Sequence, residues 1–434
     1  MFKERRKKLI DQIKKTVPDK KGSVFLWANG VIGSQLFDQE ASFYYFTGIN
    51  EPSLVLQLDF DGKTRLFIPD TQTRRARWLS DTCDTSTKTA IRLGVDEIIY
   101  FGESVAGYQL PPLFSEPEVK NLINIMQQKI AAGDVIFTCA PTHGFGYVQQ
   151  QLFLLRLAQF VPQLFNFLCD ISVEIARLRR KKDKHEVEKI FHAVQATIAA
   201  QYEVMGALGD GVEEKMVHAH IAATFAALGM QSAFAPIVAA GKNSVFPHYE
   251  GKQGILKTGD LVTVDCGAQH EHYCADLTRT YPVSGTFSSR QQEIYSIVLE
   301  CQELLESLAK PGMYLNNKEK SELSLYHQAL AFFEKRGYGE YMVHGIGHFV
   351  GLDVHDVGNA HDPLQEGDVI ALEPALYLPK DGFGIRIEDN YWITPDGAHC
   401  LSQELAKKSV DVQEILQSRE QHACGDGCDH HHHD

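Results

Sequence analysis

Long apolar runs are missing from this sequence. No stretch approaches the roughly 18 consecutive apolar residues of a membrane-spanning helix, and no apolar segment follows the basic residues near the start. The basic run at 2–15 is interrupted by Glu4 and Asp11 and contains no serine. This composition favours an exposed amphipathic helix over a mitochondrial targeting segment. We therefore expect neither a membrane span nor a secretory signal.

An excess of positive charge is also missing. The chain has 42 Lys and Arg against 56 Asp and Glu, which gives a formal net charge of −14. Because nucleic-acid binding depends on clustered Lys and Arg, this balance disfavours a nucleic-acid partner, and nothing in the sequence predicts a membrane partner. With 434 residues, of which 44% are hydrophobic, the chain can bury a large core in two or three domains.

Paired cysteines are missing as well. The nine cysteines are irregularly spaced and include no Cys-x-x-Cys motif, which favours reduced thiols and a cytoplasmic protein. Cys266 directly follows Asp265, so on a strand its side chain would point to the opposite face. We interpret Cys266 and Cys274 as core or supporting residues, not as metal ligands.

Motifs of several enzyme classes do not occur. There is no Gly-x-Ser-x-Gly nucleophile motif of an α/β hydrolase. His185 and Glu186 begin like a zinc-peptidase helix, but Lys189 stands where the second histidine belongs.

Strand and helix patterns divide the chain. Residues 1–168 alternate strand-like and helical stretches, which favours an α/β domain. A helix is predicted to begin at Asp183, where Glu186 completes a capping box. This helix lies near the start of a second domain, which we expect at 169–410. The rest of that domain is predicted to contain strands over 234–283, helices near 288–309 and 319–336, and short strands with Gly-rich turns beyond. We expect 411–434, which end in Cys424, Cys428 and four histidines, to be an unstructured tail.

Two aspartates stand out in the second domain. Asp265 ends a strand-like run, and Asp276 opens the next one. A hairpin between them can place both carboxylates side by side, which is costly without a cation. A lone aspartate would more simply cap a turn and face solvent.

Three further residues favour a metal site. His348 follows Gly345 and Gly347, which allow a close backbone approach, although a single histidine is more often a hydrogen-bonded core residue. Glu373 lies in an apolar run and therefore needs a partner. Glu388 follows Arg386 by two residues, so the two form either an ordinary ion pair or a ligand with its orienting cation. Four carboxylates and one imidazole suit hard or borderline divalent cations such as Mn²⁺.

These strings resemble the peptidase family with the pita-bread fold, which includes methionyl aminopeptidase, prolidase and aminopeptidase P. The similarity is greatest to bacterial aminopeptidase P and extends to about residue 410. It is carried by DLTRTYPVSGTFS (276–288), HGIGHFVGLDVHDVG (344–358), GIRIEDN (384–390), FYYFTGINEPSLVL (43–56) and LGVDE (93–97). The resemblance implies a creatinase-like α/β domain followed by a domain with a curved antiparallel sheet covered by helices.

The resemblance also implies roles for single residues. Asp265 would bind one metal ion, His348 and Glu373 the other, and Asp276 and Glu388 both. A hydroxide bridging two ions, most simply Mn²⁺ with Co²⁺ or Zn²⁺ as alternatives, would attack the carbonyl before a proline nitrogen. Glu373 would accept the proton. The remaining implied roles are hydrogen bonds to the substrate and oxyanion from His248 and His355, shaping of the pocket by His344 and orientation of a ligand by Arg386.

The expected substrates are peptides with proline at the second position, and the expected assembly is a dimer or tetramer. Prolidase, which cleaves Xaa-Pro dipeptides, is the alternative with the same ligands. A metal-free binding module is a further alternative, but such relatives usually lose ligands. The loop between Glu373 and Glu388 is shorter than in bacterial aminopeptidase P, and 30–40 lacks an evident acidic residue near the substrate amine, so the substrate length stays open.

Overall fold

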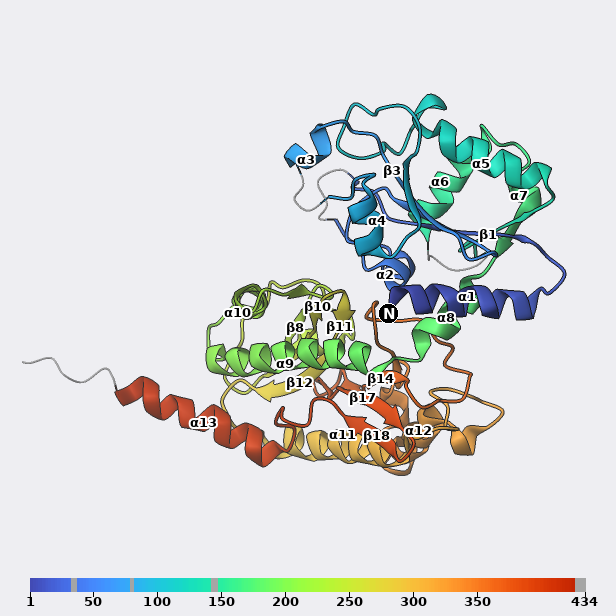
Figure 1. Cartoon of the computed structure of the whole chain (residues 1–434). Coiled ribbons are helices and arrows are strands. Elements are labelled where there is room, and N and C mark those ends of the chain that lie inside the picture. The colour runs from blue at the N-terminus through green and yellow to red at the C-terminus, as the bar shows by residue number, and fades with distance from the viewer. Residues whose placement is uncertain (33–36, 79–81, 142–146, 426–434) are drawn as a thin grey trace, which may run out of the picture. The chain divides into compact units, whose positions relative to one another are not determined.

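The computed structural model describes residues 1–32, 37–78, 82–141 and 147–425, traced in Figure 1. The chain divides into two compact units, Met1–Arg179 and Arg180–Asp434. Among the described residues, no helix is both long enough and apolar enough to cross a membrane.

The N-terminal unit is built on a six-stranded mixed sheet in the order β4-β3-β2-β1-β5-β6. Its strands are β1 (Gly22–Trp27), β2 (Val55–Asp59), β3 (Thr64–Ile68), β4 (Glu97–Tyr100), β5 (Val135–Thr138) and β6 (Leu168–Asp170). The pairs β1–β2 and β2–β3 are antiparallel, whereas β3–β4, β1–β5 and β5–β6 are parallel. The helices are α1 (Phe2–Thr16), α2 (Ala41–Thr47), α3 (Arg74–Trp78), α4 (Thr87–Leu93), α5 (Lys120–Ala131), α6 (Val148–Ala158), α7 (Leu164–Phe167) and α8 (Ser172–Arg180). The predicted α/β domain is confirmed.

The core of this unit is rich in aromatic residues. Phe25, Trp27, Phe67, Phe101 and Phe114 are all buried in one cluster. Helix α1 covers the region predicted to be an amphipathic helix, and it buries an apolar face while its lysines remain exposed.

The C-terminal unit consists of antiparallel sheets with helices on both sides (Figure 1). One sheet has the order β12-β9-β8, and another has the order β13-β14-β17-β18. Their strands are β8 (Ile237–Ala240), β9 (Leu261–Cys266), β12 (Leu277–Pro282), β13 (Gly347–Phe349), β14 (Val369–Leu372), β17 (Asp389–Thr394) and β18 (Gly397–Cys400). The smaller sheets pair β15 (Ala375–Leu378) with β16 (Phe383–Arg386), and β10 (Ala268–His270) with both β7 (Gln231–Ser232) and β11 (Tyr273–Cys274).

Helices tie these sheets together from both faces. Gln201 of α9 (Lys184–Ala207) donates to the carbonyls of Val264 and Leu277 at 3.1 Å, so α9 is fixed to β9 and β12. Gln302 of α11 (Ser289–Leu308) donates to the Leu372 carbonyl on β14 at 3.1 Å. Helices α10 (Glu214–Ala227) and α12 (Leu325–Lys335) pack against α9 and α11. This is the pita-bread arrangement that the resemblance to the peptidase family implied.

Capping explains where the two long helices begin. Asp183 and Glu186 form the predicted capping box of α9, in which each side chain accepts from the other residue's backbone N–H. Ser288 and Gln291 do the same for α11. Each box satisfies N–H groups that a helix start otherwise leaves unpaired.

The structure differs from the predicted boundaries at two places. The expected break at 168/169 falls inside β6, whose pairing with β5 keeps it in the N-terminal unit. The segment expected to be an unstructured tail instead begins with α13 (Ser409–Gly425). Val412 and Leu416, one turn apart, are buried and give this helix an apolar face. Residues 426–434, with Cys428 and the four histidines, lie outside the described residues.

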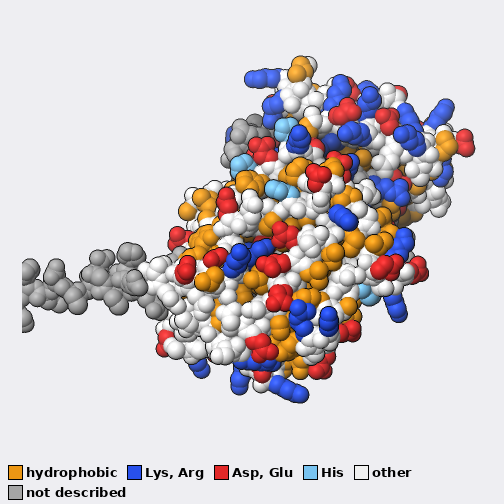
Figure 2. Space-filling model, turned by 90° about the horizontal axis from the view of Figure 1, so that it is seen from below, with side chains coloured by type: hydrophobic (Ala, Val, Ile, Leu, Met, Phe, Trp, Pro, Cys, Tyr) orange, Lys and Arg blue, Asp and Glu red, His pale blue; other side chains and the backbone are white. Residues whose placement is uncertain are grey.

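Figure 2 shows the molecule from below as a space-filling view. Basic and acidic side chains are interspersed over this face, with apolar side chains between them. This mixed distribution fits the modest negative charge of the chain.

Candidate metal centre

Strand ends bring the predicted ligands together in the C-terminal unit. Asp265 lies on β9 and pairs in register with Thr278 on β12, so Asp276, two residues before Thr278, lies on the same side. His348 on β13 pairs with Ala371 on β14, and Glu373 directly follows β14. Glu388 directly precedes β17, the other neighbour of β14.

A single open pocket contains these side chains. Every site residue predicted from the sequence lines it: Asp265, Asp276, His348, Glu373, Glu388, His248, His344, His355 and Arg386. The ligand atoms cluster tightly. In each of the trios Asp265/Asp276/Glu388, His348/Glu373/Glu388 and Asp276/His348/His355, one ligand atom per residue lies within 4.8 Å of the others.

Two carboxylate oxygens in this pocket have no hydrogen-bond partner among the described residues. They are Oδ1 of Asp265 and Oδ1 of Asp276, and both atoms are buried. A buried charged oxygen without a partner raises the free energy of the folded protein. A hard divalent cation binds about six or more such oxygens and would remove this cost. The donor set of carboxylates with one imidazole therefore fits a divalent metal ion.

The electrostatics agree with this fit. Burial raises the pKa of Asp276 well above its usual value, and the nearby charges of Glu388 and Asp265 raise it further. Burial, with Glu388, raises the pKa of Glu373 to about 8. Burial alone would lower the pKa of His348, but hydrogen bonds to Asp276 and Glu388 hold it well above its usual range. The pocket thus concentrates negative charge that a cation would neutralise.

Arg386 contacts one ligand directly. Its Nη2 donates to Oδ2 of Asp265 at 2.6 Å, and its Nη1 donates to the Tyr377 hydroxyl at 2.6 Å. The Tyr377 hydroxyl also lies 2.9 Å from Nε2 of His344. Arg386 therefore fixes the Asp265 carboxylate and, through Tyr377, the imidazole of His344.

Two of the other histidines in the pocket, His355 and His344, are neutral near pH 7. The His355 ring stacks on His348 with centroids 4.0 Å apart. Burial and His348 lower the pKa of His355 to about 4, and burial and Arg386 lower the pKa of His344 to about 4. Neutral imidazoles can donate or accept a hydrogen bond near pH 7. His248 lines the same pocket from the segment after the 3₁₀ turn Gly241–Val245.

Comparisons with known proteins match both halves of the chain. Residues 188–395 match the metallopeptidase family M24, and residues 2–109 match the aminopeptidase P N-terminal domain. Over 411 residues the chain is 31% identical to mouse Xaa-Pro aminopeptidase 3, covering 87% of this chain and 76% of that protein. The chain belongs to the aminopeptidase P family. As a member of this family it is a metal-dependent peptidase that acts on peptides.

Two further relatives define the limits of the similarity. Zinc-substituted Escherichia coli aminopeptidase P in complex with product superposes with a TM-score of 0.77 at 25% identity, covering 96% of this chain and 98% of that one. The Xaa-Pro dipeptidase of Pyrococcus furiosus is 38% identical, but over only 53% of this chain and 65% of its own length. Similarity along the whole chain therefore lies with the aminopeptidase P family, and similarity to the dipeptidase is partial.

Two supporting residues were missed by the sequence reasoning. Thr278 donates its hydroxyl hydrogen to Oε2 of Glu388 at 2.7 Å. Strand alternation could have found it, because Thr278 follows Asp276 by two residues. Tyr377 had no comparable signal, since its contacts with Arg386 and His344 depend on how β15 and β16 pair.

Proposed function

We propose that this member of the aminopeptidase P family removes the N-terminal residue of peptides with proline at position two, using two divalent cations held in the described pocket. One observation carries the proposal. Buried carboxylates from separate strands converge on a shared space, and two of their oxygens lack a partner among the described residues.

Each ligand has a proposed place. Asp265 would hold one cation, His348 and Glu373 the other, and Asp276 and Glu388 would contact both. Hard carboxylate oxygens favour Mn²⁺, with Co²⁺ or Zn²⁺ as alternatives. When bound, such ions lower the pKa of a water molecule and polarise a carbonyl group.

The chain's own residues would then carry the proton and fix the substrate. Glu373 accepts the proton of the attacking water and passes it to the proline nitrogen as the carbon–nitrogen bond breaks. His248 and His355 donate hydrogen bonds to the carbonyl oxygen as it gains negative charge. Arg386 holds Asp265, and His344, held by Tyr377, shapes the pocket wall.

A peptide-length assay separates this proposal from prolidase, the alternative that the Pyrococcus furiosus relative favours. With Mn²⁺ supplied, we expect the chain to release the first residue of Xaa-Pro-Yaa tripeptides. A tripeptide with alanine in place of proline is the control and should turn over far more slowly. Turnover of Xaa-Pro dipeptides alone would assign the chain to prolidase instead.

A metal-free preparation tests for a non-catalytic binding module. We expect the chelated protein to be inactive and to regain activity when Mn²⁺ is added. A correctly folded chain that stays inactive with Mn²⁺, Co²⁺ and Zn²⁺ would favour the binding-module alternative.

Assembly and location complete the proposal. We infer a dimer or tetramer from the resemblance to the family, and light scattering on the purified chain tests this. We also infer a cytoplasmic location, which is supported by free thiols at the seven cysteines whose side chains the structure describes, and cell fractionation tests it.

A further inference from the structure

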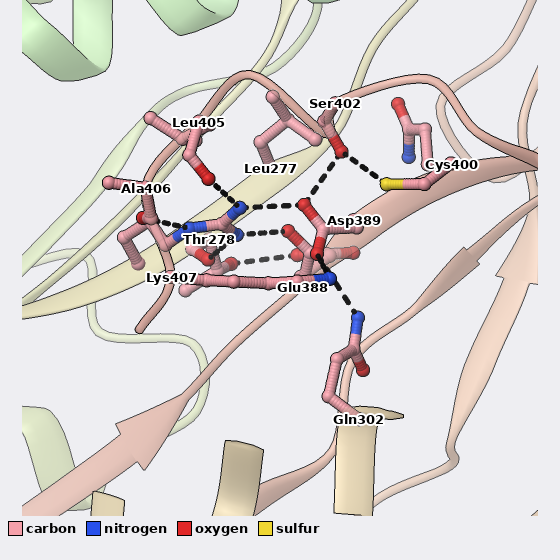
Figure 3. A network of polar contacts seen from close by, with 12 residues as sticks. Leu277, Thr278, Gln302, Glu388, Asp389, Cys400, Ser402, Leu405, Ala406 and Lys407 are labelled. Atoms are coloured by element: carbon pink, nitrogen blue, oxygen red, sulfur yellow. Dashed lines mark hydrogen bonds and ion pairs between the residues drawn. The ribbon is translucent and has the colours of Figure 1, made fainter. Parts of the chain in front are cut away.

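Behind the metal pocket lies a buried network of polar contacts centred on Asp389, drawn in Figure 3. We define the Asp389 network as Arg279, Gln302, Asp389, Ser402 and Lys407. The side chains of Arg279 and Asp389 are fully buried, and they form an ion pair at 2.7 Å. Asp389 directly follows Glu388, so the network touches the backbone of a predicted metal ligand.

Arg279 binds the backbone of three segments at once. Its Nη1 donates to the carbonyls of Thr278 and Glu388 at 2.9 and 2.8 Å. Its Nη2 and Nε donate to the carbonyls of Leu405 and Ala406 at 3.2 and 3.1 Å. The guanidinium therefore joins β12, the start of β17 and the segment that follows β18.

Asp389 receives its other contacts from that same segment and from α11. Ser402 Oγ donates to Oδ1 at 2.6 Å, and Lys407 Nζ donates to Oδ2 at 3.0 Å. Gln302 approaches Oδ2 at 3.5 Å, and Lys407 also reaches Glu306 at 3.2 Å. The segment Ser402–Lys407 thus supplies a cation, a hydroxyl and two carbonyls to the network.

This segment lies beyond residues 188–395, which match the metallopeptidase family. The segment nevertheless contacts Asp389, which is the residue directly after the predicted ligand Glu388. The Glu388 carboxylate accepts a hydrogen bond from the Thr278 hydroxyl. The Thr278 carbonyl in turn accepts from the Arg279 guanidinium and from the backbone N–H of Glu388. Both the backbone and the carboxylate of Glu388 are therefore held by residues that the network fixes.

We propose that Lys407 and Ser402 are positioning residues for the metal centre, which act through Asp389 and Arg279 to hold the Glu388 carboxylate where a cation binds. The proposal rests on the proposed function, in which Glu388 is a metal ligand. Like-charged carboxylates in the pocket repel one another before a cation binds, so a stiff support behind Glu388 keeps the ligands preorganised.

The direction in which cation affinity changes when Lys407 is replaced distinguishes a positioning role from a purely electrostatic one. Removing a positive charge near the pocket should strengthen cation binding if Lys407 acts only through space. If Lys407 acts by positioning, its loss should weaken cation binding instead. A metal titration therefore distinguishes the two roles.

The test is Mn²⁺ binding to the full chain by calorimetry, at a temperature well below unfolding. We expect Lys407→Met to raise the Kd by about 10- to 100-fold, the usual effect of losing an outer partner of a metal ligand. Lys407→Arg keeps the charge and the reach to Asp389, so it should retain most of the affinity. Activity of Lys407→Met should recover as the Mn²⁺ concentration is raised.

Arg75→Met provides a matched control. Arg75 forms a buried ion pair with Glu51 at 2.9 Å in the N-terminal unit, which contains none of the predicted ligands. This variant should lose stability while keeping the wild-type Kd for Mn²⁺. A loss of affinity in Lys407→Met but not in Arg75→Met then reflects positioning and not general destabilisation.

The opposite results overturn the inference. A folded Lys407→Met chain with unchanged or tighter Mn²⁺ binding contradicts it. If that variant does not fold, Ser402→Ala must still weaken binding, and an unchanged Kd there contradicts it equally. A wild-type chain that binds no Mn²⁺ overturns the proposed function and this inference with it, whereas tight wild-type binding with unaffected variants overturns this inference alone.

Discussion

At the scale of single residues, the metal pocket is a place where the chain alone is electrostatically unfavourable. Four carboxylates line the pocket, those of Asp265, Asp276, Glu373 and Glu388, and the cationic groups that face them, among the described residues, are the Arg386 guanidinium and the His348 imidazole. Buried like charges raise the free energy of a folded protein unless a counterion is present. The loss of one carboxylate should therefore weaken metal binding but stabilise the metal-free protein.

Asp276→Asn tests this opposition. We expect Mn²⁺ affinity to fall by more than the roughly 10- to 100-fold caused by losing an outer partner. The metal-free chain should become more stable, by about 1 kcal/mol or more, because a buried and repelled charge is removed. Calorimetry and urea unfolding measure the two effects.

Asp381→Asn is the control for that variant, since Asp381 forms an exposed ion pair with Arg290. Asp381→Asn should change neither the Mn²⁺ affinity nor the stability of the metal-free chain appreciably. A metal-free Asp276→Asn chain that is clearly less stable than wild type would contradict the electrostatic argument.

A pH-dependent prediction concerns Asp59 in the N-terminal unit. Burial raises the pKa of Asp59, but hydrogen bonds from Ser23, Lys129 and Gln57 outweigh burial and lower it. A lowered folded-state pKa stabilises the fold above the unfolded value of about 3.9, and this stability is lost as the pH falls further.

Asp59→Asn should therefore lower the free energy of unfolding at pH 7, by roughly 1–3 kcal/mol for lost charged hydrogen bonds. The difference from wild type should shrink as the pH falls below about 4. Urea titrations across this range measure it. If the difference in unfolding free energy between variant and wild type widens at low pH, the pKa of Asp59 is not lowered.

At the scale of elements, β13 depends on a glycine. A Cβ added at Gly347 would lie 2.0 Å from the Ala371 carbonyl oxygen on β14, so any side chain forces the two strands apart. His348 is the next residue on β13. We expect Gly347→Ala to lose Mn²⁺ binding as well as stability.

Gly345→Ala is the matched control, because a Cβ there meets no atom within 4 Å. It should keep Mn²⁺ affinity near wild type. Equal affinity in both variants, measured by calorimetry, would show that the close approach at Gly347 does not position His348.

Sequence reasoning succeeded where the information is local. The Asp183 capping box, the apolar strands and the alternation that places Asp265 and Asp276 together all follow from neighbouring residues. The motif strings added His348, Glu373 and Glu388 through resemblance to a family.

It failed where contacts join distant segments. Arg279 reaches Ala406, and Tyr377 links His344 to Arg386, and no local pattern announces either contact. Helix α13 was missed because 411–434 were interpreted as one tail from their His- and Cys-rich C-terminal residues, although Val412 and Leu416, four residues apart, are buried. These features depend on tertiary packing, which a single sequence does not display.

At the scale of the whole molecule, metal should stabilise one unit and not the other. At a concentration 100 times the Kd, a ligand adds about 2.7 kcal/mol to the stability of the state that binds it. With Mn²⁺ added, amide hydrogen exchange should therefore slow in β9, β12, β14 and β17, whereas β1 and β2 should be unchanged. Equal slowing in both units, or none, would contradict a metal site confined to the C-terminal unit.

The most direct measurement is anomalous scattering from crystals of the chain grown with Mn²⁺. We predict two adjacent peaks enclosed by Asp265, Asp276, His348, Glu373 and Glu388. A single peak would contradict the two-ion account, and peaks elsewhere or none in this pocket would contradict the metal site itself.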